Sequence, residues 1–215
     1  MKKDLTELVF ILDKSGSMGG LESDTIGGYN SLLSKQKGLQ GEAVITTVLF
    51  DQGVHLLHDR INLKAVSELT SQDYQVGGST ALLDAIGLTI DKIGNAIKHT
   101  DDAYRPEKVM VVIITDGEEN ASRHYSAERV RSMITHQKDK YGWEFIFLGA
   151  NIDAVKTAAD FGIDASRAQN YNNDKTGVEL NFRVMSEAIS SMRSSKTMDE
   201  HWKDSIDQDF KKRKQ

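Results

Sequence analysis

The feature that most constrains the fold is a set of short apolar runs without polar alternation. Residues 8–12 and 108–115 are the most apolar of these runs, and segments with helical spacing of apolar residues lie between them. A strand that is apolar on both faces has to be buried on both faces, which is typical of parallel sheets covered by helices. Strands and helices alternate over most of the chain. This order predicts an α/β fold with a doubly wound, mostly parallel sheet and helices on both faces.

The expected elements follow from these patterns. We expect strands at residues 8–12, 43–50, 54–61, 108–115, 143–148 and 168–171, and helices at residues 21–37, 81–98, 126–140, 153–161 and 178–192. The strand at 54–61 follows its predecessor so closely that the two must form a hairpin, which places one antiparallel strand at the sheet edge. The strand at 108–115 is the most apolar and is expected in the middle of the sheet.

Composition limits the class of protein. The chain has 215 residues with 39% hydrophobic and 27% charged residues, as in ordinary globular proteins, and we expect one domain over residues 1–195. From Arg193 onward the chain is polar, and residues 196–215 are expected to form a frayed, basic C-terminal tail. The net charge of −5 argues against nucleic acid as a partner. Cysteine is absent, which excludes disulfides and thiolate metal sites.

The cellular location is an expectation from the sequence. The apolar stretch before Asp13 is too short for a secretory signal, and nowhere do about 18 apolar residues run together as a membrane helix requires. We therefore expect a cytoplasmic protein without a membrane partner. The oligomeric state stays open.

Three oxygen-bearing side chains follow the first apolar run. Asp13, Ser15 and Ser17 are spaced by two, so an extended or gently curling loop turns them toward one side. Hard oxygen ligands at the carboxyl end of a parallel strand suit a small, hard cation such as Mg²⁺. Taken alone, the stretch fits equally well with turn residues that end a strand and cap a helix.

Two further segments favour the metal interpretation. Asp116 directly follows the strand at 108–115, and Thr80 closes a Gly-Gly-Ser-Thr stretch before the helix at 81–98. Loops after adjacent central strands meet at the carboxyl edge of an open α/β sheet. Together the five side chains supply two negative charges and three neutral hydroxyls, which balance a divalent cation. Mg²⁺ takes six oxygens, so a position stays open for solvent or for an external carboxylate.

These three segments closely resemble the von Willebrand factor type A (VWA) domain. Its metal-ion-dependent adhesion site uses an Asp-x-Ser-x-Ser loop, a distant Thr and a distant Asp, and the matching positions here are Asp13, Ser15, Ser17, Thr80 and Asp116. The likeness covers about residues 5–192. It implies a Rossmann-like sheet with one antiparallel edge strand, and a Mg²⁺, Mn²⁺ or Ca²⁺ ion that bridges to an Asp or Glu of a protein partner. Without cysteines, the chain looks more like stand-alone bacterial members that work beside AAA+ ATPases or in stress resistance.

Other functions were weighed against this one. A Mg²⁺-dependent phosphohydrolase could use Asp13 as nucleophile. Such sites usually contain a second carboxylate nearby and a lysine that neutralises the charge of the phosphate. No residue is placed as a general base, and the glycine-rich nucleotide-binding motifs are absent. We therefore expect a protein that is not an enzyme. Glu118, Glu119 and Asn120 are expected to be solvated loop residues near the site, and Asp84 a charge on a helix face.

Overall fold

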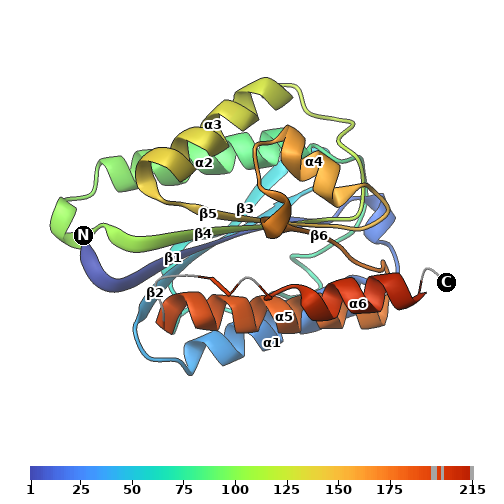
Figure 1. The fold of residues 1–215 in the computed structure, drawn as a ribbon, viewed down its shortest axis with the longest axis horizontal. Coiled ribbons are helices and arrows are strands. Elements are labelled where there is room, and N and C mark those ends of the chain that lie inside the picture. Colours follow the sequence, from blue (N-terminus) through green and yellow to red (C-terminus); the bar gives the residue numbers. More distant parts are fainter. Residues whose placement is uncertain (195–197, 200, 214–215) are drawn as a thin grey trace.

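The computed structural model describes residues 1–194, 198–199 and 201–213, and it contains a six-stranded sheet (Figure 1). The strand order is β3-β2-β1-β4-β5-β6. All neighbours are parallel except β2 and β3, which form the expected antiparallel hairpin at the edge. The strands are β1 (Lys2–Asp13), β2 (Glu42–Phe50), β3 (Val54–Asn62), β4 (Pro106–Thr115), β5 (Glu144–Gly149) and β6 (Ala168–Asn170).

Helices cover both faces of the sheet. On one face lie α1 (Glu22–Lys37), α5 (Lys175–Ser194) and α6 (Asp204–Arg213), and on the other lie α2 (Leu82–Lys98), α3 (Ala127–Tyr141) and α4 (Ala154–Asp160). Single turns of 3-10 helix occupy Gly16–Met18, Asp102–Tyr104 and Ala165–Arg167. The fold class is therefore the one that the sequence predicts. No helix in the described part of the chain has the length and apolar character that crossing a bilayer requires.

The core consists of two layers on opposite faces of the sheet, and β1 contributes side chains to both. Leu8, Phe10 and Leu12 belong to the layer under α1 and α5, whereas Val9 and Ile11 belong to the layer under α2 and α3. Successive side chains of a strand point to opposite faces, so an uninterrupted apolar run fills both layers at once. This burial explains why β1 shows no polar alternation.

The sheet topology determines where a ligand could bind. The chain leaves β1 toward α1 on one face, and it leaves β4, the neighbour of β1, toward α3 on the opposite face. In an open α/β sheet, the loops diverge at such a switch point and leave a crevice at the carboxyl ends of the two strands. Asp13 and Asp116 lie at those two strand ends.

Two expected boundaries were wrong. β1 begins at Lys2 rather than at Leu8, because its first residues pair with the strands on either side despite their polar side chains. In the expected C-terminal tail, residues 204–213 form α6 rather than frayed chain. Trp202 and Ile206 are buried in the core layer that α1 and α5 cover. The Trp202 indole donates a hydrogen bond to the Ser166 carbonyl at 2.9 Å. Two apolar residues within a charged segment gave too weak a pattern to predict this packing.

Candidate metal centre

Asp13 is held at the junction of β1 and β4. Its side chain is buried, and both carboxylate oxygens accept hydrogen bonds: Oδ1 from the Ser15 backbone N–H at 2.7 Å and Oδ2 from the Thr115 hydroxyl at 2.6 Å. The first bond curls the loop after β1, and the second ties that loop to the end of β4. The Asp13 carboxylate therefore has a fixed orientation at the switch point of the sheet.

The glycine-rich segment before α2 docks on this first loop. The Gly16 N–H donates to the Gly78 carbonyl at 3.1 Å, and the Gly77 N–H donates to the Lys14 carbonyl at 2.9 Å. Gly78 has φ of +73°, a conformation that residues with a Cβ atom rarely adopt. This turn brings Thr80 to the first loop.

Thr80 is joined in turn to the loop after β4. Its backbone N–H donates to Asn120 Oδ1 at 2.9 Å, and the Asn120 N–H donates back to the Thr80 carbonyl at 3.0 Å. Asn120 is exposed, as expected, and it also connects the two loops. Glu119 was also expected to be a solvated loop residue, but it accepts hydrogen bonds from the Leu83 and Ser122 backbone N–H groups.

The hydroxyls and the second carboxylate converge at the centre of these loops. Ser15 Oγ lies 3.1 Å from Ser17 Oγ, which donates to Asp116 Oδ1 at 2.5 Å. A Cβ atom built on Gly117 would lie 3.3 Å from Thr80 Oγ1 and 3.4 Å from Ser17 Oγ, so these two hydroxyls approach the backbone closely at Gly117. The structure thus brings together the five side chains that the sequence singled out.

Both carboxyl groups are affected by their burial. Burial raises the pKa of Asp13, while hydrogen bonds from Ser15 and Thr115 oppose this rise and the nearby Asp116 adds to it. Burial likewise raises the pKa of Asp116, against hydrogen bonds from Ser17 and Asn173. A bound cation would offset the cost of keeping two carboxylates ionised in this crevice.

The donor set fits a hard divalent cation. All five side chains offer oxygen, which Mg²⁺, Mn²⁺ and Ca²⁺ prefer, and none offers the sulfur or imidazole nitrogen that Zn²⁺ or Cu²⁺ favours. The described residues contain no group of three or more His, Cys, Asp or Glu side chains arranged for a metal. A cation here would therefore depend on the three hydroxyls as much as on the two carboxylates.

Sequence reasoning missed three residues around this centre. The Tyr74 hydroxyl donates to the Asp13 carbonyl, and Asn173 Nδ2 donates to Asp116 Oδ2 at 2.9 Å. Asp84, expected as a helix-face charge, is instead buried and accepts from the backbone N–H groups of residues 123–125. No motif indicates these contacts, since each joins segments at least 39 residues apart.

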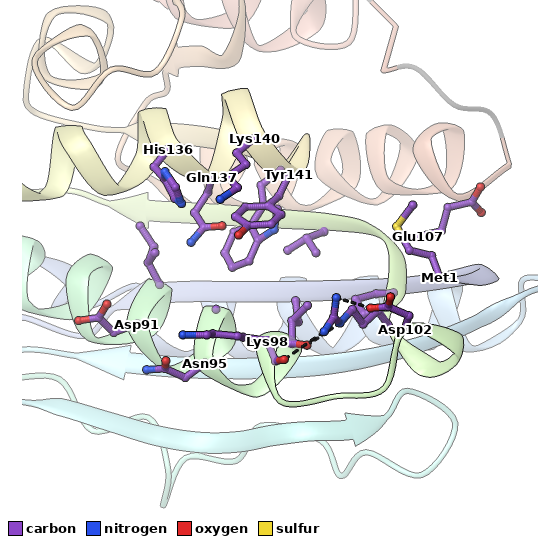
Figure 2. Close-up of a pocket in the computed structure, with 17 residues that line it drawn as sticks. Met1, Asp91, Asn95, Lys98, Asp102, Glu107, His136, Gln137, Lys140 and Tyr141 are labelled. Carbon is purple, nitrogen blue, oxygen red and sulfur yellow. Dashed lines mark hydrogen bonds and ion pairs between the residues drawn. The ribbon is translucent and has the colours of Figure 1, made fainter.

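A large surface groove lies at the opposite edge of the sheet. It has a volume of about 670 Å³ between α2 and α3, and it extends over the start of β4 (Figure 2). Among its lining residues, the Arg105 guanidinium is bound to the Ile97 and Thr100 carbonyls at the end of α2. Its charged groups carry both signs and do not converge on one point. The candidate site is therefore the crevice at the carboxyl edge.

Comparisons with known proteins bear on the fold. No family model matches the sequence, and no curated protein matches it. Solved structures do match: a von Willebrand factor type A protein from Catenulispora acidiphila superimposes with a TM-score of 0.55 at 14% identity over 86% of this chain. The pilus adhesin SpaC from Lactobacillus rhamnosus GG gives 0.67 at 13% identity over 89% of the chain. The chain has the von Willebrand factor type A fold.

The chain spans 43% of the Catenulispora protein and 31% of SpaC, whereas it covers 100% of BatB from Bacteroides thetaiotaomicron, with a TM-score of 0.51 at 14% identity over 88% of this chain. Identities this low establish the VWA architecture alone.

Proposed function

We propose that this VWA domain binds a protein partner through a Mg²⁺-type cation held by Asp13, Ser15, Ser17, Thr80 and Asp116. The observation that carries the proposal is the convergence of oxygen atoms from three distant loops, of which the 2.5 Å contact between Ser17 and Asp116 is the clearest. Backbone hydrogen bonds between the loops hold these oxygens in place. Such preorganisation is expected of a binding site.

The charges at the site favour an acidic group on the partner. Two carboxylates neutralise a divalent cation, but the three hydroxyls bring no charge to their side of the ion. A partner's Asp or Glu can therefore fill an open coordination position at little electrostatic cost. Glu118 is exposed on the loop after β4, so an extended acidic surface would be repelled and a single carboxylate is preferred.

No observation among the described residues favours the phosphohydrolase alternative. Lys14, the lysine nearest to Asp13 in sequence, pairs with Asp51. Both oxygens of Asp13 accept hydrogen bonds from protein groups, which does not favour nucleophilic attack. We propose that the domain is not an enzyme. Turnover of a generic phosphatase substrate that is lost in Asp13→Asn would contradict this proposal.

The first prediction concerns metal binding. Asp13→Ala is expected to weaken Mg²⁺ binding at least about 100-fold, because it removes a charged ligand for which nearby residues cannot substitute. Calorimetric titration with Mg²⁺ measures the affinity, and circular dichroism checks that the fold is kept. Asp59→Ala is the matched control: it makes the same charge change on the exposed edge strand β3 and should bind Mg²⁺ as wild type does. Equal binding by wild type and Asp13→Ala would refute the proposal.

The partner is tested separately. Tagged wild-type protein is expected to retain a partner from its source cell in Mg²⁺, to release it in EDTA and to regain it when Mg²⁺ is restored. Asp13→Ala should retain nothing specific under any of these conditions. A partner that is retained equally in EDTA and by Asp13→Ala would show that binding does not depend on the metal.

A second prediction uses the close approach of the Thr80 and Ser17 hydroxyls to Gly117. Gly117→Ala is expected to lower Mg²⁺ affinity about tenfold, because the new methyl group crowds the hydroxyls of Thr80 and Ser17. The melting temperature without Mg²⁺ should change little, since the methyl group approaches side-chain hydroxyls rather than the backbone. Calorimetry and thermal unfolding separate the two effects. An unchanged Mg²⁺ affinity would place the cation away from these two hydroxyls.

A further inference from the structure

A fourth loop, between β6 and α5, also reaches the candidate centre. Asn173 Nδ2 donates to Asp116 Oδ2 at 2.9 Å, while the other oxygen of Asp116 accepts from Ser17. The Asn173 Oδ1 atom is buried and has no hydrogen-bond partner among the residues that the structure describes. A buried polar atom is normally paired, so this one needs an explanation.

The position of this oxygen suggests what pairs with it. The two polar atoms of an amide group are about 2.3 Å apart, so Asn173 Oδ1 lies within about 5 Å of the Asp116 carboxylate. Oδ1 can only accept a hydrogen bond or bind a cation. A divalent ion at Asp116 keeps several water molecules, and each of them is a strong donor. A water bound to the cation is therefore a suitable partner.

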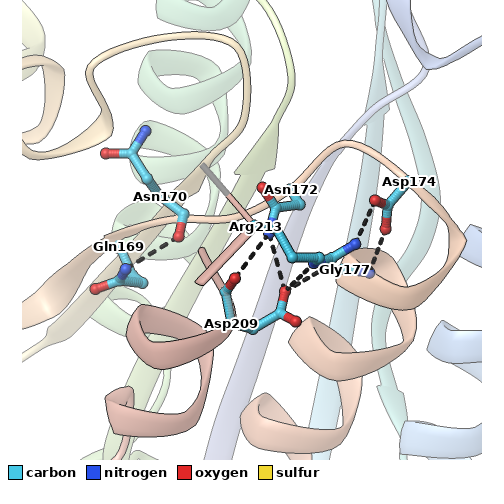
Figure 3. Close-up of polar contacts among 7 residues, drawn as sticks. All are labelled: Gln169, Asn170, Asn172, Asp174, Gly177, Asp209 and Arg213. Atoms are coloured by element: carbon cyan, nitrogen blue, oxygen red, sulfur yellow. Dashed lines mark hydrogen bonds and ion pairs between the residues drawn. The ribbon is translucent and has the colours of Figure 1, made fainter. Parts of the chain in front are cut away.

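The loop that carries Asn173 is fixed on both sides (Figure 3). Asn172 donates to Asp209 Oδ2 of α6 at 3.0 Å, and Arg213 of α6 pairs with both Asp209 and Asp174. Asp174 in turn accepts from the Gly177 N–H at 2.8 Å, which caps the start of α5. The segment that the sequence assigned to a frayed tail thus helps to hold Asn173 against Asp116.

We infer that Asn173 is a sixth side chain of the cation site. Its Nδ2 group orients the Asp116 carboxylate, and its Oδ1 atom accepts a hydrogen bond from a water bound to the cation. This inference rests on the proposed metal site. An amide adds this oxygen without adding charge, so the attraction of the site for a partner's carboxylate is preserved.

Mg²⁺ titration of matched variants tests the role of Asn173. Asn173→Ala is expected to bind Mg²⁺ about tenfold more weakly than wild type, as is typical when a residue that supports metal ligands is lost. Asn173→Leu fills a similar volume without a polar atom, and it is expected to bind as weakly as Asn173→Ala. Asn95→Ala is the control, because it removes an asparagine of α2 that lines the groove at the opposite edge of the sheet, and its affinity should stay within twofold of wild type.

Other outcomes would contradict either the role of Asn173 or the proposed metal site itself. If wild type binds Mg²⁺ and Asn173→Ala binds it equally well, the role of Asn173 is wrong and the proposed function stands. The same holds if Asn95→Ala loses as much affinity as Asn173→Ala, or if Asn173→Leu binds Mg²⁺ as tightly as wild type. If wild type binds no Mg²⁺, the proposed function itself fails and this inference fails with it.

A second measurement follows the side-chain amide resonances of the wild-type protein by NMR as Mg²⁺ is added. The side-chain amide resonance of Asn173, assigned by its absence from the spectrum of Asn173→Asp, is expected to shift on Mg²⁺ saturation more than that of Asn172. A larger shift at Asn172 than at Asn173 would overturn the inference, whatever the stability of the variants.

Discussion

Arg60→Met is expected to destabilise the folded protein by about 3–5 kcal/mol at pH 7, because it leaves the buried Glu7 carboxylate without its partner. Glu7 lies on β1 with a fully buried side chain, and Arg60 on β3 contacts it through Nε at 3.0 Å and through a terminal nitrogen at 2.9 Å. Methionine retains most of the side-chain volume. Both residues carry a Cβ atom, so the positive φ of 50° at position 60 adds no new strain.

The stability lost in Arg60→Met should be larger at neutral pH than at acidic pH. Burial raises the pKa of Glu7 above its ordinary value, and the contacts with Arg60 oppose this rise. Without Arg60 the pKa of Glu7 in the folded state rises further, so the folded variant binds a proton that the unfolded chain lacks. The stability of the variant relative to wild type therefore falls as pH rises through this range and recovers on acidification. Urea unfolding of both proteins at pH 5 and pH 7 should show the smaller difference at pH 5.

A double variant serves as control. In Glu7→Leu with Arg60→Met neither charge of this pair remains, and the stability of the double variant is expected to approach or exceed that of wild type, since a buried ion pair can be replaced by apolar residues at little cost. A loss below about 1 kcal/mol in Arg60→Met alone, with no pH dependence, would show that Glu7 reaches solvent or another partner.

Gly177→Ala is expected to cost about 3 kcal/mol of the free energy of unfolding. A Cβ atom at this position would lie 1.9 Å from the Asn172 carbonyl oxygen and 2.9 Å from its carbon, so the backbone of the loop before α5 has to move. A backbone segment cannot swing aside as a flexible side chain can. The displaced loop is also the one that α6 holds through Asn172 and Asp174. Urea unfolding measures the loss.

The matched control is Gly27→Ala in the interior of α1. A Cβ atom there meets no atom within 4 Å, so the change is expected to stabilise the protein by up to about 1 kcal/mol through helix propensity alone. Opposite signs for the two substitutions would support the packing described at the start of α5. A stabilising Gly177→Ala would contradict it.

The sequence predicted the architecture because the dominant signals were local. The apolar runs of β1 and β4 specify strands that are buried on both faces, and the short turn at residues 51–53 specifies the hairpin. The position of the five site residues followed from one topological rule, that loops at the carboxyl ends of adjacent parallel strands meet. These arguments needed no knowledge of side-chain contacts.

The contacts that the sequence left unpredicted are all long-range. Asp84 looks like any helix-face carboxylate, and only the path of residues 123–125 past the start of α2 makes it a buried acceptor of three backbone N–H groups. Asn173 is one of several asparagines after β6, and its contact with Asp116 depends on how α6 packs. Periodicity and motif spacing carry no information on such pairings.

The most direct test of the central claim is to locate the cation itself. We expect a crystal soaked in Mn²⁺ to show one strong anomalous peak within bonding distance of the Ser15 and Ser17 hydroxyls, beside Thr80 and Asp116. The same soak of Asp13→Ala should show no peak there. A Mn²⁺ peak at another place in the wild-type protein, with these side chains unoccupied, would contradict the account.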